Sequence, residues 1–85
     1  KLMKYSITLL VNGQELEGSG KTIEEALIKI TPPAKIVTKV IIRVAIGGVT
    51  KERLVKPHQV MKLFSDNPIT REIVLKNFRI MFNLP

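Results

Sequence analysis

The sequence predicts an α+β domain with the element order ββαββαα, in which four mainly antiparallel strands form a sheet with the helices on one face. Two stretches of the chain alternate apolar and polar residues and turn back at a glycine-containing pair, as the strands of a hairpin do. Apolar residues at helical spacing follow each of these stretches, and prolines mark where the helices begin or end. This pattern does not determine the order of the strands in the sheet.

Composition sets the broad class of the protein. The 85 residues, 45% of them hydrophobic, suffice for a single domain 1–85 with its own core, in which residues 1–3 are expected to be a flexible or added extension before the natural start at Met3. No apolar run approaches the roughly 18 residues of a membrane-spanning helix, and no signal-peptide pattern is visible. The absence of cysteine excludes disulfides, thiolate zinc sites and thiol catalysis. We therefore expect a cytoplasmic, intracellular protein.

The net charge of +7 is distributed unevenly along the chain. In residues 1–34 four lysines balance four glutamates, whereas residues 35–85 carry ten cations against Glu52, Asp66 and Glu72. Such an asymmetry concerns the partners of a protein rather than its fold. It predicts an anionic partner that contacts the second half of the chain.

The first half of the chain predicts a hairpin and a short helix. Asn12-Gly13 is the strongest short signal for a two-residue turn, which would place Leu9 opposite Leu16 on the inner face. Thr22 with Glu25 three residues later forms a capping box. The apolar stripe of the helix that follows consists of Ile23, Ala26, Leu27 and Ile30, and Thr31-Pro32-Pro33 ends it.

The second hairpin, Ile36 to Lys56, turns at Gly47-Gly48 and allows two registers. A two-residue loop places Arg43 opposite Glu52, and it places Lys51 and Arg53 on the side of the core. A three-residue loop with a glycine bulge shifts the return strand by one residue, so that Leu54 points inward. The outer face is then shared by Lys39, Arg43, Lys51 and Arg53. We favour the bulged register because it keeps two cations out of the core.

Two helices are predicted to complete the chain. A short one opens at Pro57-His58 and runs through Phe64, and a longer one begins at Pro68, with Asn67 as its N-cap, and ends at about Phe82. The longer helix is apolar on more than one side. We expect it to pack against the sheet and against a second surface, either the preceding helix or another copy of the chain.

Several motifs that could indicate chemistry have simpler explanations. Gly20-Lys21-Thr22 resembles the end of a P-loop, but Glu15 stands where that motif needs its first glycine. His58 is the only histidine, so it is assigned to packing at a helix end rather than to a metal. The helix pair 58–82 offers few polar residues for reading bases and is better explained as a helix hairpin than as a helix-turn-helix. We predict a protein that is not an enzyme and has no catalytic residues, cofactor or metal.

The best functional signal is a basic face on the second hairpin. It comprises Lys35, Lys39, Arg43, Lys51, Arg53 and Lys56. Spaced cations on a strand pair can follow a phosphate backbone, so we predict a nucleic-acid-binding module with little sequence specificity, binding either DNA or RNA. Further contacts could come from Lys62, Arg71, Lys76 and Arg79.

A protein-interaction domain is the alternative function, for example a small regulator, inhibitor or assembly subunit. It would act through the apolar C-terminal helix or a sheet edge, on an acidic protein or in a homodimer. A role at a membrane surface is not expected, because no helix combines a basic face with a fully apolar one.

Overall fold

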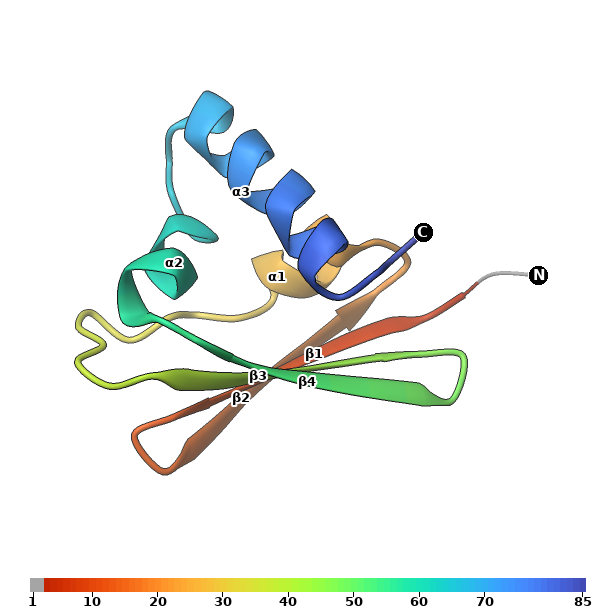
Figure 1. Cartoon of the computed structure of the whole chain (residues 1–85), viewed down its shortest axis with the longest axis horizontal. Coiled ribbons are helices and arrows are strands. Elements are labelled where there is room, and N and C mark those ends of the chain that lie inside the picture. Colours follow the sequence, from red (N-terminus) through yellow and green to blue (C-terminus); the bar gives the residue numbers. More distant parts are fainter. Residues whose placement is uncertain (1–2) are drawn as a thin grey trace.

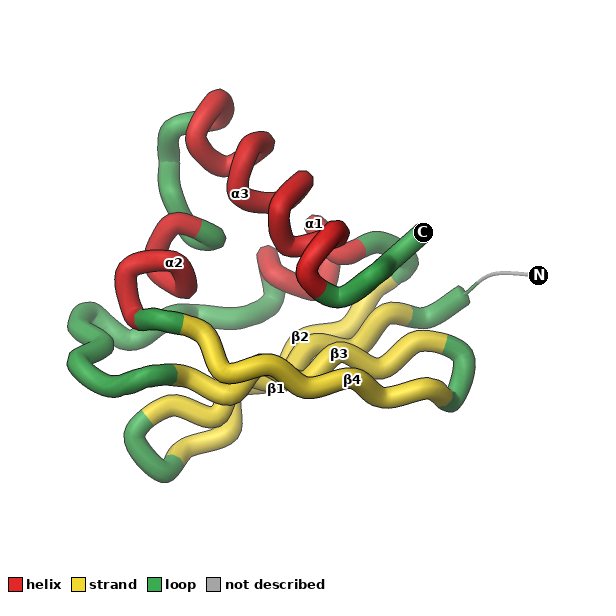
Figure 2. Tube along the Cα trace, in the orientation of Figure 1, coloured by secondary structure: helices red, strands yellow, loops and turns green. Residues whose placement is uncertain are grey.

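Four antiparallel strands form one sheet, and three helices cover one of its faces (Figures 1 and 2). The computed structural model describes residues 3–85, so the expectation for Lys1 and Leu2 lies outside the described residues. The elements in chain order are β1 (Tyr5–Val11), β2 (Gln14–Gly20), α1 (Ile23–Ile28), β3 (Val40–Ile46), β4 (Val49–Val55), α2 (Pro57–Lys62) and α3 (Pro68–Met81). The predicted fold class and element order are confirmed.

The strand order is β2-β1-β3-β4, so the two hairpins lie side by side. Their junction is the ladder between β1 and β3, which runs from the pair Tyr5↔Ile46 to the pair Leu10↔Ile41. The edge strands of the sheet are β2 and β4. No helix of residues 3–85 is both long enough and apolar enough to cross a lipid bilayer.

The first hairpin has the predicted register. Asn12 and Gly13 both adopt positive φ, at 50° and 77°, as a type I′ turn requires. Leu9 therefore lies opposite Leu16 on the face that the helices cover.

The second hairpin has the two-residue register, and the prediction of a bulged three-residue loop is wrong. Gly47 and Gly48 adopt φ of 55° and 82°, so the two glycines form the whole turn and no extra residue remains for a bulge. Val44 then lies opposite Lys51. The expected start of the strand at Ile36 is also wrong, because the β3–β4 ladder ends at Val40 and the preceding residues have no strand beside them.

The helix boundaries follow from local capping. Thr22 Oγ1 accepts a hydrogen bond from the Glu25 N–H at 3.1 Å, as predicted, while the Glu25 carboxylate accepts one from the Lys21 N–H at 2.6 Å. The N-cap of α3 is Asn67, whose Oδ1 accepts hydrogen bonds from the first turn, with Pro68 as the first helical residue.

The C-terminus of α3 forms a Schellman motif. Asn83 has φ of 52°, and its N–H donates to the Ile80 carbonyl. The Leu84 N–H donates to the Arg79 carbonyl. These bonds leave the carbonyls of Met81, Phe82 and Asn83, at the end of the helix, free to accept other donors.

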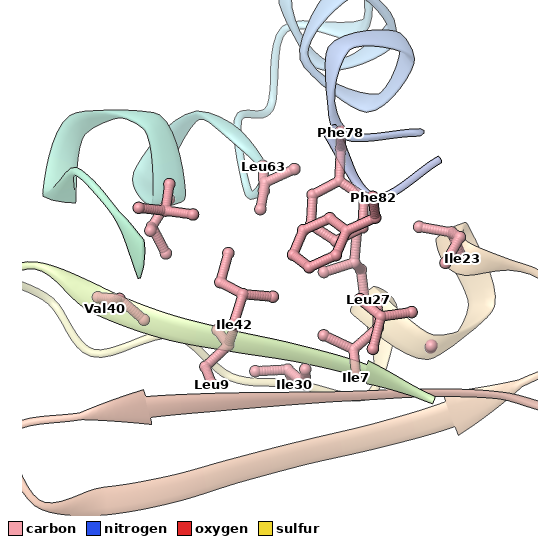
Figure 3. Close-up of a cluster of buried hydrophobic side chains, with 14 of the residues drawn as sticks. Ile7, Leu9, Ile23, Leu27, Ile30, Val40, Ile42, Leu63, Phe78 and Phe82 are labelled. Carbon is pink, nitrogen blue, oxygen red and sulfur yellow. The ribbon is translucent and has the colours of Figure 1, made fainter. Parts of the chain in front are cut away.

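The hydrophobic core lies between the helices and the covered face of the sheet (Figure 3). Phe78 and Phe82 reach down from α3 toward Ile7 and Ile42 of the sheet, and the centres of their two rings are 4.7 Å apart. Leu27 of α1 closes the same cluster. Because burial of a side chain of this size contributes about 1.5–3 kcal/mol, these contacts hold α3 on the sheet.

Candidate functional site

The register of the second hairpin places Lys51 and Arg53 on the face of β4 that looks toward the helices. Lys51 Nζ donates hydrogen bonds to the carbonyls of Phe82 at 2.9 Å and Asn83 at 3.2 Å. Arg53 Nε donates to the Met81 carbonyl at 3.4 Å. The C-terminus of a helix carries partial negative charge, so both cations stabilise the end of α3. Lys51 is half-buried and Arg53 is exposed, as expected for long charged side chains on an edge strand.

The outer face of the sheet is not basic, and the prediction that Lys39, Arg43, Lys51 and Arg53 share it is wrong. Arg43 Nε lies 2.7 Å from Glu52 Oε2, and this hydrogen-bonded carboxylate raises the pKa of Arg43. In the same cross-strand row Glu17 lies opposite Thr8, which in turn lies opposite Arg43. The outer face therefore carries more carboxylates than cations along this row.

Of the remaining predicted residues, Lys39 and Lys56 lie at one end of the sheet, and Lys35 lies on the chain segment that leads to it. Lys39 directly precedes Val40 and Lys56 directly follows Val55, and Val40 and Val55 form the last pair of the β3–β4 ladder. Lys35 belongs to the segment 29–39, which runs past α2 to the start of β3 (Figure 1).

Lys62 is the last residue of α2, which begins directly after Lys56, and we call Lys35, Lys39, Lys56 and Lys62 the cationic end. All four side chains are exposed. The two ion pairs found within residues 3–85 involve none of them. Three of the six residues predicted for the basic face therefore belong to the cationic end and not to the outer face of the sheet.

A second notable surface is the solvent-facing side of α3. Ile69, Ile73 and Ile80 are 72%, 57% and 69% exposed, and we call them the isoleucine stripe. The opposite side of α3 packs on the sheet through Leu75 and Phe78. The predicted packing of α3 against the sheet is confirmed, whereas its second apolar side is open to solvent in the isolated chain.

A groove of about 300 Å³ separates α2 from α3. Its floor is formed by the buried side chains of Ile42, Val55, Leu63 and Phe78. Its rim is formed by exposed residues of the two helices, among them His58, Gln59, Lys62, Ile73 and Asn77. The sequence did not predict this groove, because its shape depends on the angle between the two helices. The isoleucines at positions 69, 73 and 80 are nevertheless recognisable in the sequence as a second apolar stripe.

An ion pair links α1 to α3. Glu24 Oε2 accepts a hydrogen bond from Arg79 at 2.6 Å. Partial burial opposes ionisation of Glu24, but the hydrogen bond and the positive charges of Arg79 and Arg71 outweigh it, so the pKa of Glu24 is lowered. This pair joins two helices rather than forming a binding site.

The described residues hold no group of three or more metal-binding side chains of the His, Cys, Asp and Glu types. Comparison of the chain with protein-family models, with curated proteins and with solved structures finds no match.

Proposed function

We propose that the chain is a small nucleic-acid-binding module that contacts phosphates through the cationic end. The observation that carries this proposal is that Lys39 and Lys56 flank the last pair of the β3–β4 ladder, with Lys35 and Lys62 on the adjoining segments of the chain. All four lysines are exposed, and none of them is in either ion pair of residues 3–85. Lysine–phosphate contacts release counterions from the nucleic acid, which makes affinity steeply dependent on salt.

Low sequence specificity is part of the proposal. Proteins that bind single strands tightly stack bases on exposed aromatic side chains. Here Phe78 and Phe82 are buried, and Tyr5 and Phe64 pack against the core. Affinity would therefore come from the phosphate backbone, with little discrimination between base sequences.

The test is fluorescence anisotropy with labelled single-stranded DNA, duplex DNA and RNA of one length, each titrated over a salt series. We expect the double variant Lys39→Gln/Lys56→Gln to weaken binding to every sequence alike. Loss of two phosphate contacts should reduce the log–log salt slope by about 1.4–1.8, depending on the strand type.

The chain offers a matched control at the opposite end of the sheet. Lys4 precedes Tyr5 and Lys21 follows Gly20, and these two residues form the terminal pair of the β1–β2 ladder. The variant Lys4→Gln/Lys21→Gln removes the same charge from an equivalent position and should leave the slope near that of the wild type. An equal loss in both double variants, or no binding by the wild type at low salt, would count against the proposed surface.

A further inference from the structure

The groove between α2 and α3 combines an apolar floor with a polar rim that lacks carboxylates. No aspartate or glutamate of residues 3–85 lines the groove, whereas Lys62 lies on the α2 side. Ile73, more than half exposed, joins the groove to the isoleucine stripe. This is a continuous apolar surface bordered by positive charge.

Arg53 is a second cation beside the groove; it does not line the groove itself but contacts residues that do. It lies opposite Ile42 in the β3–β4 ladder and projects from the same face of β4 as Val55. Both Ile42 and Val55 line the groove. Its Nε is bound to the carbonyl of Met81, another groove residue, at 3.4 Å. The terminal nitrogens of the guanidinium make no hydrogen bond to residues 3–85 and could hold a carboxylate in a bidentate pair.

We propose that this groove binds an acidic amphipathic helix of a partner protein. A surface between two helices with an apolar floor suits a third helix, which inserts side chains spaced at i, i+3, i+4 and i+7. The volume of about 300 Å³ is roughly twice that of a cavity that holds a benzene ring, so it accommodates about two aliphatic side chains. Carboxylates on the flanks of the partner helix would pair with Lys62 and Arg53.

Charge also argues against a second copy of the chain as the occupant. Each copy carries +7, so two copies repel each other. Among the helices of residues 3–85 only α1 is acidic, and it buries Ile23, Ala26 and Leu27 in its own core, so that a single exposed isoleucine, Ile28, remains for contact with another copy. Helix α3 carries Arg71, Lys76 and Arg79 against Glu72, so it is itself basic.

The experiment is selection of binders to the full chain from a displayed library of random 18-residue peptides. We expect the enriched sequences to carry net negative charge and apolar residues at helical spacing. A synthetic peptide of the consensus sequence should bind at least tenfold more weakly to Ile73→Glu and at least fivefold more weakly to Lys62→Glu.

Matched controls exist on α1. Ile28 is 70% exposed and Lys29 follows it, so Ile28→Glu and Lys29→Glu repeat the same chemical changes away from the groove. Both should bind the peptide within twofold of the wild type. The double variant Lys39→Gln/Lys56→Gln should do so too, because these two lysines of the cationic end do not line the groove, whereas Lys62 belongs to both surfaces. Because Ile73 is exposed, circular dichroism should show that Ile73→Glu keeps the native fold.

Three results would overturn the proposal. The enriched peptides could show no acidic excess, or Ile73→Glu could bind the consensus peptide as well as the wild type does. Light scattering could instead find a dimer of the wild type that Ile73→Glu converts to a monomer, which would place a second copy on this surface.

Discussion

Lys51 and Arg53 place positive charge on the side of a strand where the alternation of the sheet would favour apolar residues. They are tolerated there because the end of α3 lies above them and presents carbonyl oxygens. A cation beside the C-terminus of a helix is stabilising by itself, and the hydrogen bonds add to that effect. Their role in the fold explains why they are absent from the outer face.

The contribution of Lys51 can be measured with Lys51→Met, which keeps an aliphatic side chain and removes the ammonium group. We expect the free energy of unfolding to fall by about 1–2 kcal/mol, because the carbonyls of Phe82 and Asn83 lose a charged donor. Urea unfolding followed by circular dichroism measures it. Lys35→Met removes an exposed lysine from a loop and should change stability by less than about 0.5 kcal/mol. Equal losses in the two variants would contradict the capping role of Lys51.

Position 18 requires glycine because α1 lies very close to β2 at this point. A Cβ at this position would overlap the carbonyl oxygen of Ala26 and would lie 3.0 Å from Ile30 Cγ1. We expect Gly18→Ala to destabilise the fold by about 2–3 kcal/mol, since the backbone of α1 must shift. Thermal unfolding measures the effect, and the melting temperature of the control variant Ser19→Ala, at the neighbouring position, should stay close to that of the wild type. A melting temperature for Gly18→Ala that is unchanged would show that α1 is free to move away from the sheet.

At the scale of elements, the accuracy of the sequence prediction follows the range of the interactions involved. The turn at Asn12-Gly13 and the caps Thr22 and Asn67 depend on a few neighbouring residues, and each was predicted correctly. The register of the second hairpin is harder to predict, because Lys51 is tolerated beside the core only through carbonyl partners that lie 31 and 32 positions later in the chain.

The same reasoning applies to the functional surfaces. The excess of positive charge in residues 35–85 is visible in the sequence, but its division into paired, capping and free cations depends on contacts between distant elements. The segment from Ile36 to Lys39 was predicted to begin the strand, yet it lies beyond the last pair of the ladder. Ile36 is nevertheless buried, so an apolar residue at this position marks the core rather than a paired strand.

At the scale of the whole molecule, stability should depend on pH through the ion pair between α1 and α3. The pKa of Glu24 is lower in the folded chain than its usual value, so its contribution is present at neutral pH and is lost as the pH falls through the folded pKa. We expect Glu24→Gln to lower the free energy of unfolding at pH 7. As the pH falls below the usual pKa of a glutamate, the free energy of unfolding should then decrease less in Glu24→Gln than in the wild type. The effect should stay below about 1 kcal/mol, because both side chains are more than one third exposed.

Urea unfolding at a series of pH values measures this dependence. The control is Glu17→Gln, which removes an exposed carboxylate of β2 that makes no ion pair within residues 3–85. Parallel pH profiles of Glu24→Gln and the wild type would show that the pair with Arg79 does not stabilise the junction of the two helices.

The strand order β2-β1-β3-β4 also has a consequence for how the chain folds. Each hairpin closes over a two-residue turn, and a hairpin can form within about 1–10 μs. The ladder that joins the hairpins pairs residues 31 to 41 positions apart, so we expect the search for this one pairing to limit the folding rate. Until it forms, β1 and β3 each present an unpaired edge to other unfolded chains. Refolding at high protein concentration should therefore favour aggregation through β1 and β3, the two central strands of the native sheet.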